Sequence, residues 1–192
     1  MKHYALAILA ALAVCSCASE PQYLPEWQEG WLDIHHISTG RGNSALIIMP
    51  DGTNLLVDCG DNAISKAEEH NEVLPILPDD SKHPAEWIMD YFKHFAPQSV
   101  NNTSLDYAMI THYHNDHMGG VDEPFAVQTD SLPFLLNGIT ELGVLMPIST
   151  LINRSDLDNP IMPENYKTYI KEWREPRGLR TESHNHTAIS PP

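Results

Sequence analysis

The chain has 192 residues, of which 42% are hydrophobic and 19% are charged, a composition typical of one globular domain with its own core. Its 26 acidic and 11 basic residues give a formal net charge of −15. Such acidity repels polyanions at long range, whereas nucleic-acid-binding surfaces are usually basic. We therefore expect no extended nucleic-acid surface on this protein.

The first 16 residues are typical of a secretory signal. A short basic start is followed by an apolar run over residues 5–14, which is too short to cross a bilayer as a mature helix. Residues 14–17 (VCSC) resemble a bacterial lipobox, in which the small Ser16 favours lipidation of Cys17. An ordinary cleaved signal is the alternative. Lipidation predicts a protein of the cell envelope, held at the outer membrane or the periplasmic face by its lipid anchor only.

The cysteines predict no intrachain disulfide. Cys15 is removed with the signal, Cys17 carries the lipid, and Cys59 is left alone. Because Cys59 ends an apolar segment, we predict a small buried residue there rather than a nucleophile.

Residues 17–30 are polar and contain proline, so we predict a tether there and a folded domain over residues 31–175. The first elements predicted from the apolar pattern are strands at 31–34, 44–49 and 54–59, with a hairpin turn at 50–53. Residues 61–81 are predicted to form a loop or a short helical insert.

A helix is predicted over residues 84–95, because large apolar side chains recur there at helical spacing and Pro84 suits a first turn. A strand at 105–110 follows it. The order strand, turn, strand, helix, strand is typical of an α/β fold. The later elements predicted are a strand at 142–148, a helix at 165–173 and a disordered tail over residues 176–192.

A histidine-rich segment directly follows the strand at 105–110. His112 and His114 are two residues apart at the strand end, so their imidazoles point to the same side and can hold one metal ion. Asp116 and His117 come next and can face a second ion. Imidazole with carboxylate suits zinc, with iron and manganese as alternatives. A surface loop that is merely rich in histidine is the other interpretation, and the fixed register between an apolar strand and a Gly-Gly pair disfavours it.

Residues 111–120 (THYHNDHMGG) resemble the T-H-x-H-x-D-H-x-G-G signature of the metallo-β-lactamase superfamily. The resemblance implies a metallo-β-lactamase-type αβ/βα sandwich, an α/β fold, and metal-dependent hydrolysis. It implies four metal ligands, His112 and His114 for the first ion and Asp116 and His117 for the second, and we also assign Asp116 a catalytic role. Asp58, in Asp-Cys-Gly, matches the family's Asp-x-Gly, whose carboxylate supports the metal loop from behind.

Residues 32–58 are similar to the opening of the hydrolase domain in competence (DNA-uptake) proteins, with Arg41-Gly42-Asn43 loosely matching a Gln-Gly-Asp loop. The family also has a His, a bridging Asp and a last His further along its chain. The histidines after His117 are His184 and His186, in the predicted tail, and the later aspartates do not end apolar strands. We therefore predict the N-terminal half of the fold plus part of the second half, as in the product of a truncated gene.

Two functions follow from these observations. The first is a secreted, membrane-tethered hydrolase in which metal-activated hydroxide attacks a small-molecule substrate, either a phosphodiester or another ester. The second is a truncated or degenerate lipoprotein with a partial metal site and no catalysis.

Overall fold

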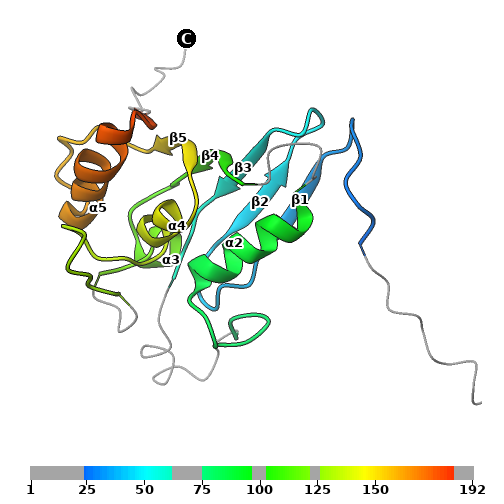
Figure 1. Cartoon of the computed structure of the whole chain (residues 1–192), viewed down its shortest axis with the longest axis horizontal. Helices are drawn as coiled ribbons and strands as arrows, with labels where there is room; N and C mark the ends of the chain where they lie inside the picture. The colour runs from blue at the N-terminus through cyan, green and yellow to red at the C-terminus, as the bar shows by residue number, and fades with distance from the viewer. Residues whose placement is uncertain (1–23, 62–74, 97–102, 122–125, 184–192) are drawn as a thin grey trace, which may run out of the picture.

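The computed structural model describes residues 24–61, 75–96, 103–121 and 126–183 (Figure 1). The predicted signal, the lipidation site Cys17 and the first part of the predicted tether lie outside these residues. None of the helices in the described ranges has the length and apolar character needed to span a membrane.

The described residues form one six-stranded sheet with the strand order β1-β2-β3-β4-β5-β6. The strands are β1 (Asp33–His36), β2 (Ala45–Ile48), β3 (Asn54–Val57), β4 (Leu105–Met109), β5 (Ile148–Asn153) and β6 (Arg180–Ser183). The first three strands are antiparallel, and β3 to β6 run parallel. The predicted turn between β2 and β3 is present, since Met49 N–H donates to Thr53 O at 2.8 Å.

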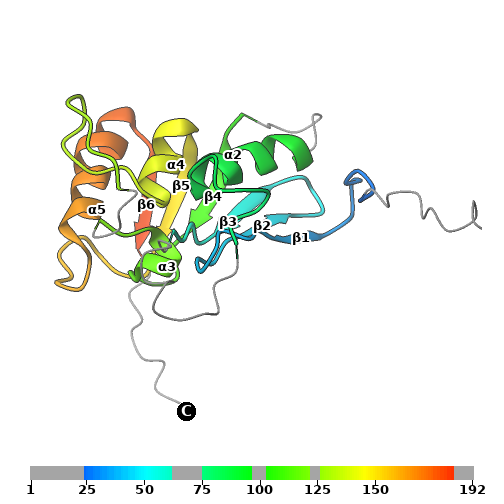
Figure 2. The ribbon, with the colours of Figure 1, turned by 90° about the horizontal axis from the view of Figure 1, so that it is seen from below.

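Helices lie against one face of this sheet (Figure 2). They are α2 (Pro84–Phe95), α4 (Ile139–Leu145) and α5 (Glu164–Thr168), which continues as the π-helix η3 (Tyr169–Arg174) and the short 3₁₀ turn η4 (Glu175–Arg177). The short helix α3 (Asn115–Met118) follows β4 and does not lie on this face. Helix α2 has the predicted bounds, and the amide of His83 donates to the Glu86 carboxylate at 3.0 Å across its first turn. The predicted helix at 165–173 is confirmed as α5 with η3. This arrangement confirms the α/β fold class.

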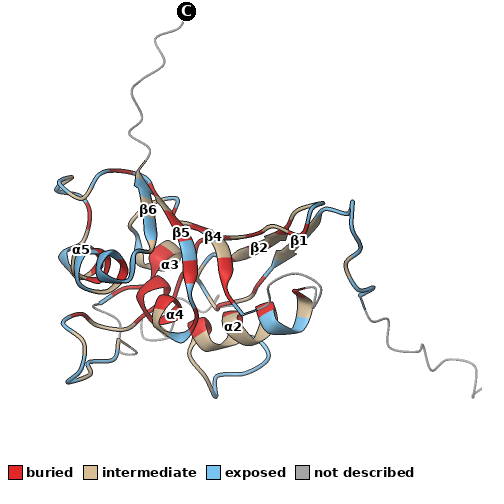
Figure 3. Ribbon diagram, turned by 45° about the horizontal axis from the view of Figure 1, so that its top comes forward, coloured by how far each residue is buried: buried red, intermediate tan, exposed pale blue. Residues whose placement is uncertain are grey.

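The core lies between the sheet and the helices (Figure 3). Leu46, Leu56, Ala108 and Leu151 are register partners across β2 to β5, and each has an exposed fraction of 1% or less. Burial of such apolar side chains is the main source of stability for a sheet layer. The core therefore fixes the ends of β3 and β4, where the predicted site residues lie.

The opposite sheet face is apolar but less covered by the described residues. Ile34, Ile47, Leu55 and Tyr107 are register partners across this face. Ile34 is 56% exposed and Tyr107 is 39% exposed, whereas Ile47 and Leu55 are partly buried. The described residues thus form one layer of strands and one layer of helices.

The predicted strand at 142–148 is wrong. Residues 139–145 form helix α4, and the strand β5 begins only at Ile148. Ile139, Leu142 and Met146 are buried at helical spacing against the core. A short apolar run without a clear period does not distinguish a buried helix from a strand, which explains the error.

The predicted disordered tail is wrong for the residues described at its start. Arg180–Ser183 forms the edge strand β6, paired with β5. The buried guanidinium of Arg174 donates to the backbone oxygens of Ile148 at 3.1 Å and Arg180 at 2.6 Å. Main-chain pairing and a buried arginine hold this strand, so it needs no apolar period. Residues 184–192 lie outside the described residues.

The last part of the predicted tether contacts the domain. Trp27 packs on the edge of the core and donates through Nε1 to Trp31 O at 2.8 Å. The amide of Gly30 donates to Pro50 O at 2.7 Å. Residues 27–30 are therefore attached to the β2–β3 turn.

Candidate metal centre

The segment from Thr111 to Gly120, here called the metal loop, leaves the end of β4 and contains helix α3. His114 directly precedes the helix, and Asp116 and His117 lie within it. The strand predicted at 105–110 puts the His-x-His pair at a strand end. The strand stops at Met109, so the pair lies in the turn between strand and helix.

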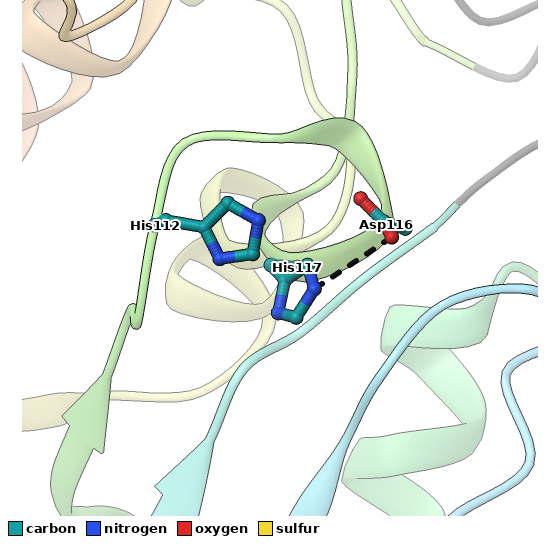
Figure 4. A group of neighbouring side chains, drawn as sticks. All are labelled: His112, Asp116 and His117. Carbon is teal, nitrogen blue, oxygen red and sulfur yellow. Dashed lines mark ion pairs between the residues drawn. The ribbon is translucent and has the colours of Figure 1, made fainter.

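Three of the predicted ligands lie together (Figure 4). One ligand atom from each of His112, Asp116 and His117 lies within 4.8 Å of the others, and no other such group of metal-binding side chains occurs in the described ranges. His117 Nε2 is 3.6 Å from Asp116 Oδ2. The rings of His112 and His117 have centroids 3.8 Å apart.

His114 is outside this group of three but contacts it. Its Nδ1 lies 3.1 Å from His112 Nε2, whereas the group of three places His112 with Asp116 and His117, the two residues predicted for the second ion. Two nitrogen ligands on one tetrahedral zinc ion at about 2.0–2.1 Å are separated by about 3.3 Å. The pair His112–His114 and the pair Asp116–His117 both have separations close to this value. The donor set therefore fits a site for one or two metal ions.

Asp58 lies directly behind the metal loop. Its carboxylate accepts hydrogen bonds from His117 Nδ1 at 2.7 Å, from the Thr111 amide at 2.8 Å and from Thr111 Oγ1 at 2.8 Å. Because a carboxylate only accepts, the neutral His117 ring carries its proton on Nδ1 and has its lone pair on Nε2. Asp58 has φ = 61°, a left-handed conformation that aspartate and asparagine tolerate better than most residues. The carboxylate of Asp58 thus bonds the metal loop at Thr111 and His117, and its support of a metal ligand stays a prediction.

Burial of the ring, and then the positive charges that His117 and His114 can carry, lower the pKa of His112 below its ordinary value. The neutral imidazole is therefore favoured near neutral pH, and it is the form that binds a metal ion.

Main-chain bonds join the metal loop to the loop after β3. The amide of Cys59 donates to His117 O at 2.8 Å, and the amide of Asp61 donates to Asn115 O at 3.2 Å. At Gly60, an added Cβ would lie 1.8 Å from Asp116 O, so only glycine permits this approach. Cys59 itself is buried, and burial raises the pKa of its thiol well above the ordinary value. It is a small neutral core residue, as predicted.

Three further residues hold the metal loop through contacts that were not predicted from the sequence. Asn43 donates its amide to Asp116 O at 2.6 Å, and its side-chain Nδ2 is 3.1 Å from His117 Nε2. Asn137 donates through Nδ2 to Gly120 O at 2.5 Å. Gly138 has φ = 54° and touches the loop, since an added Cβ would be 2.4 Å from Met118 O. The Asn-Gly dipeptide signals a turn, but nothing in the sequence places that turn beside the metal loop.

The remaining candidate ligands are not brought to this cluster. Asp130, Asp156 and Asp158 are described, and none joins the group of three. His184 and His186 lie outside the described residues. The bridging aspartate and later histidines of the family are therefore not matched by the described part of the chain.

A comparison with protein-family models finds a match to the family described as Metallo-beta-lactamase superfamily, over residues 37–123. The matched stretch is a little less than half of the chain, and it contains Asp58 and the entire metal loop. No curated protein and no solved structure matched the chain. The mixed six-stranded sheet with its helices is consistent with the metallo-β-lactamase fold.

Proposed function

We propose that this chain is a metal-dependent hydrolase of the metallo-β-lactamase type, with zinc as its metal. The observation that carries the proposal is the grouping of His112, Asp116 and His117 within 4.8 Å, with Asp58 fixing the protonation of His117. The family match over residues 37–123 supports the same function. His114, beside His112, completes the set of four ligands.

Zinc would supply a hydroxide nucleophile near neutral pH and would polarise the oxygen of the bond that is attacked. In this chain His112 and His114 would hold one ion, and Asp116 with His117 would face a second. Asp58 keeps the Nδ1 proton of His117 in place, which leaves Nε2 available as a ligand. Asp116, with 39% of its side chain exposed, is also accessible to a substrate.

For the substrate we propose a small phosphodiester or another small ester. The similarity of residues 32–58 to competence-type hydrolase domains supports a phosphodiester. The net charge of −15 makes a long nucleic-acid track unfavourable. A small substrate satisfies both observations.

The test combines metal stoichiometry with turnover. The protein without residues 1–16 is titrated with zinc, then assayed on bis-p-nitrophenyl phosphate and p-nitrophenyl acetate. We expect close to two equivalents of zinc and turnover of at least one substrate. We expect the His114→Ala variant to lose turnover, whereas His94→Ala, which changes an exposed histidine of α2, keeps it.

Less than one equivalent of zinc with no turnover on either substrate would support the other candidate. That candidate is a truncated or degenerate lipoprotein with a partial metal site. It is favoured by the absence of the later family ligands from the cluster in the described ranges.

We further propose that the protein is secreted and anchored in the cell envelope through a lipid on Cys17. The support is the apolar run over residues 5–14 followed by Ser16-Cys17. Expression of the full chain in a bacterium should place it in the membrane fraction, and a Cys17→Ser variant should not be found there. Equal distribution of both forms would contradict the anchor.

A further inference from the structure

Asn43 is held in place by its main chain, directly beside the metal loop. Its amide donates to Asp116 O at 2.6 Å, and its carbonyl accepts from the Gly60 amide at 3.0 Å. With both peptide groups bonded, the position from which its side chain emerges is fixed. The carboxamide therefore reaches the cluster from a rigid support.

The carboxamide of Asn43 bonds the nitrogen of His117 that would bind a metal. Because Asp58 accepts a hydrogen bond from the Nδ1–H group of His117, the Nε2 atom of the neutral ring is an acceptor. Asn43 Nδ2 donates to this nitrogen over 3.1 Å. A lone pair that binds a metal ion cannot also accept this hydrogen bond. In the metal-bound protein, the Asn43 amide would thus need another acceptor at the cluster.

A hollow of about 290 Å³ lies beside this amide. Asn43 and Asp58 both line it, together with His36 at the end of β1. This volume is close to the lower end of small-molecule sites, about 300 Å³. The residues that line the hollow include Asn43 but none of the four predicted metal ligands. Because Asn43 also bonds His117, its carboxamide can meet an oxygen of a substrate that extends from the hollow to the cluster.

We infer that Asn43 is a substrate-binding residue whose carboxamide donates a hydrogen bond to an anionic oxygen of the substrate, phosphoryl or carboxyl. In the metal-free chain the same amide caps His117 Nε2 and competes with the metal ion. This inference rests on the proposed hydrolase function. Removal of the Asn43 amide should therefore strengthen zinc binding and weaken phosphate binding. A purely structural role for Asn43 does not produce these two opposite effects.

The test compares Asn43→Ala with Asn165→Ala. Asn165 is the control, because its side chain bonds the main chain of Leu135 and not a predicted metal ligand. We expect zinc to bind Asn43→Ala about 2- to 10-fold more tightly, as the competing hydrogen bond is gone. We expect inorganic phosphate to bind the zinc-loaded variant about 10-fold more weakly. Both values should be unchanged in Asn165→Ala.

A parallel loss of zinc affinity and thermal stability in Asn43→Ala would overturn the inference, since it would show a structural role. Unchanged phosphate affinity would overturn it as well. A third measurement needs no metal: the ¹⁵N chemical shift of His117 Nε2 should move in metal-free Asn43→Ala and not in the control, and a constant shift would refute the contact.

Failure of the proposed function is distinct from these outcomes. If the proposed function fails, the wild-type protein binds no zinc. If only the inference fails, the wild type binds zinc normally and Asn43→Ala changes neither the zinc affinity nor the phosphate affinity. A wild type without zinc overturns the substrate role of Asn43, and the ¹⁵N measurement still decides whether Asn43 caps His117.

Discussion

Replacing Asp58 by asparagine should weaken zinc binding by reversing the protonation of His117. Asparagine tolerates the left-handed backbone of this position, where φ is 61°, so the substitution changes hydrogen bonding rather than conformation. The carboxylate accepts from His117 Nδ1 at 2.7 Å and from the Thr111 amide at 2.8 Å. An asparagine has one oxygen for these two donors, so its NH₂ must face one of them.

The magnitude follows from that conflict. If the NH₂ faces His117, the ring must move its proton to Nε2, the atom that should bind zinc. If it faces Thr111, the amide of this residue loses its acceptor in a partly buried bond, at a cost of up to about 3 kcal/mol. Loss of a carboxylate behind a metal ligand typically lowers metal affinity about 10- to 100-fold, or about 1.4–2.7 kcal/mol. We expect a loss in this range for Asp58→Asn.

Zinc affinity is measured by competition with a chromophoric chelator, and the His117 tautomer by ¹⁵N NMR of the metal-free protein. Asp106→Asn is the control, because Asp106 Oδ2 accepts from the Asn54 amide at 3.0 Å in the sheet, away from the metal loop. Zinc affinity within about twofold of wild type, with the proton retained on Nδ1, would refute the reasoning.

Two further substitutions test the supports of the loop and of α4. Gly138→Ala should lower the free energy of unfolding in urea by about 2–4 kcal/mol, because its Cβ would lie 2.4 Å from Met118 O at a φ of +54°. Gly178→Ala, at φ = 67° with open space around it, should cost only about 1–2 kcal/mol, and equal costs would contradict the close contact. Burial raises the pKa of Glu141 above its ordinary value, although His83 partly opposes this. The Glu141 carboxyl thus binds its proton more tightly in the native state than in the unfolded state. Its contribution to the free energy of unfolding is therefore present below the ordinary pKa and is lost as pH rises through the raised pKa. Glu141→Gln should remove that decline from the unfolding free energy measured against pH, and an identical pH profile would contradict it.

The elements with a clear period were predictable from the sequence. Helix α2 has the predicted bounds because its apolar side chains repeat every three or four residues and Pro84 marks its start. Strands β2, β3 and β4 followed from short apolar runs next to turn residues. Helix α4 and strand β6 were missed for opposite reasons. The first is buried on most sides, polar residues included, and the second is an exposed edge held by Arg174 and main-chain pairing.

The candidate site shows a similar division. His112, His114, Asp116 and His117 are close in sequence, so local spacing was enough to group them. Asp58 was found through its similarity to a family motif. Asn43 and Asn137 act through contacts across 74 and 17 positions of the chain, and such pairings depend on the tertiary fold. Sequence spacing carries no information about them.

The metal loop is held mainly by its peptide groups. The carbonyls of Asn115, Asp116 and His117 are bound by main-chain amides of the neighbouring loops, and these bonds do not depend on which side chains the three residues carry. The scaffold and the reactive groups can therefore change separately. If the proposed function holds, a substitution at Asp116 would alter which metal is preferred while the loop keeps its path, so the chemistry of such a centre could diverge in evolution without a change of fold.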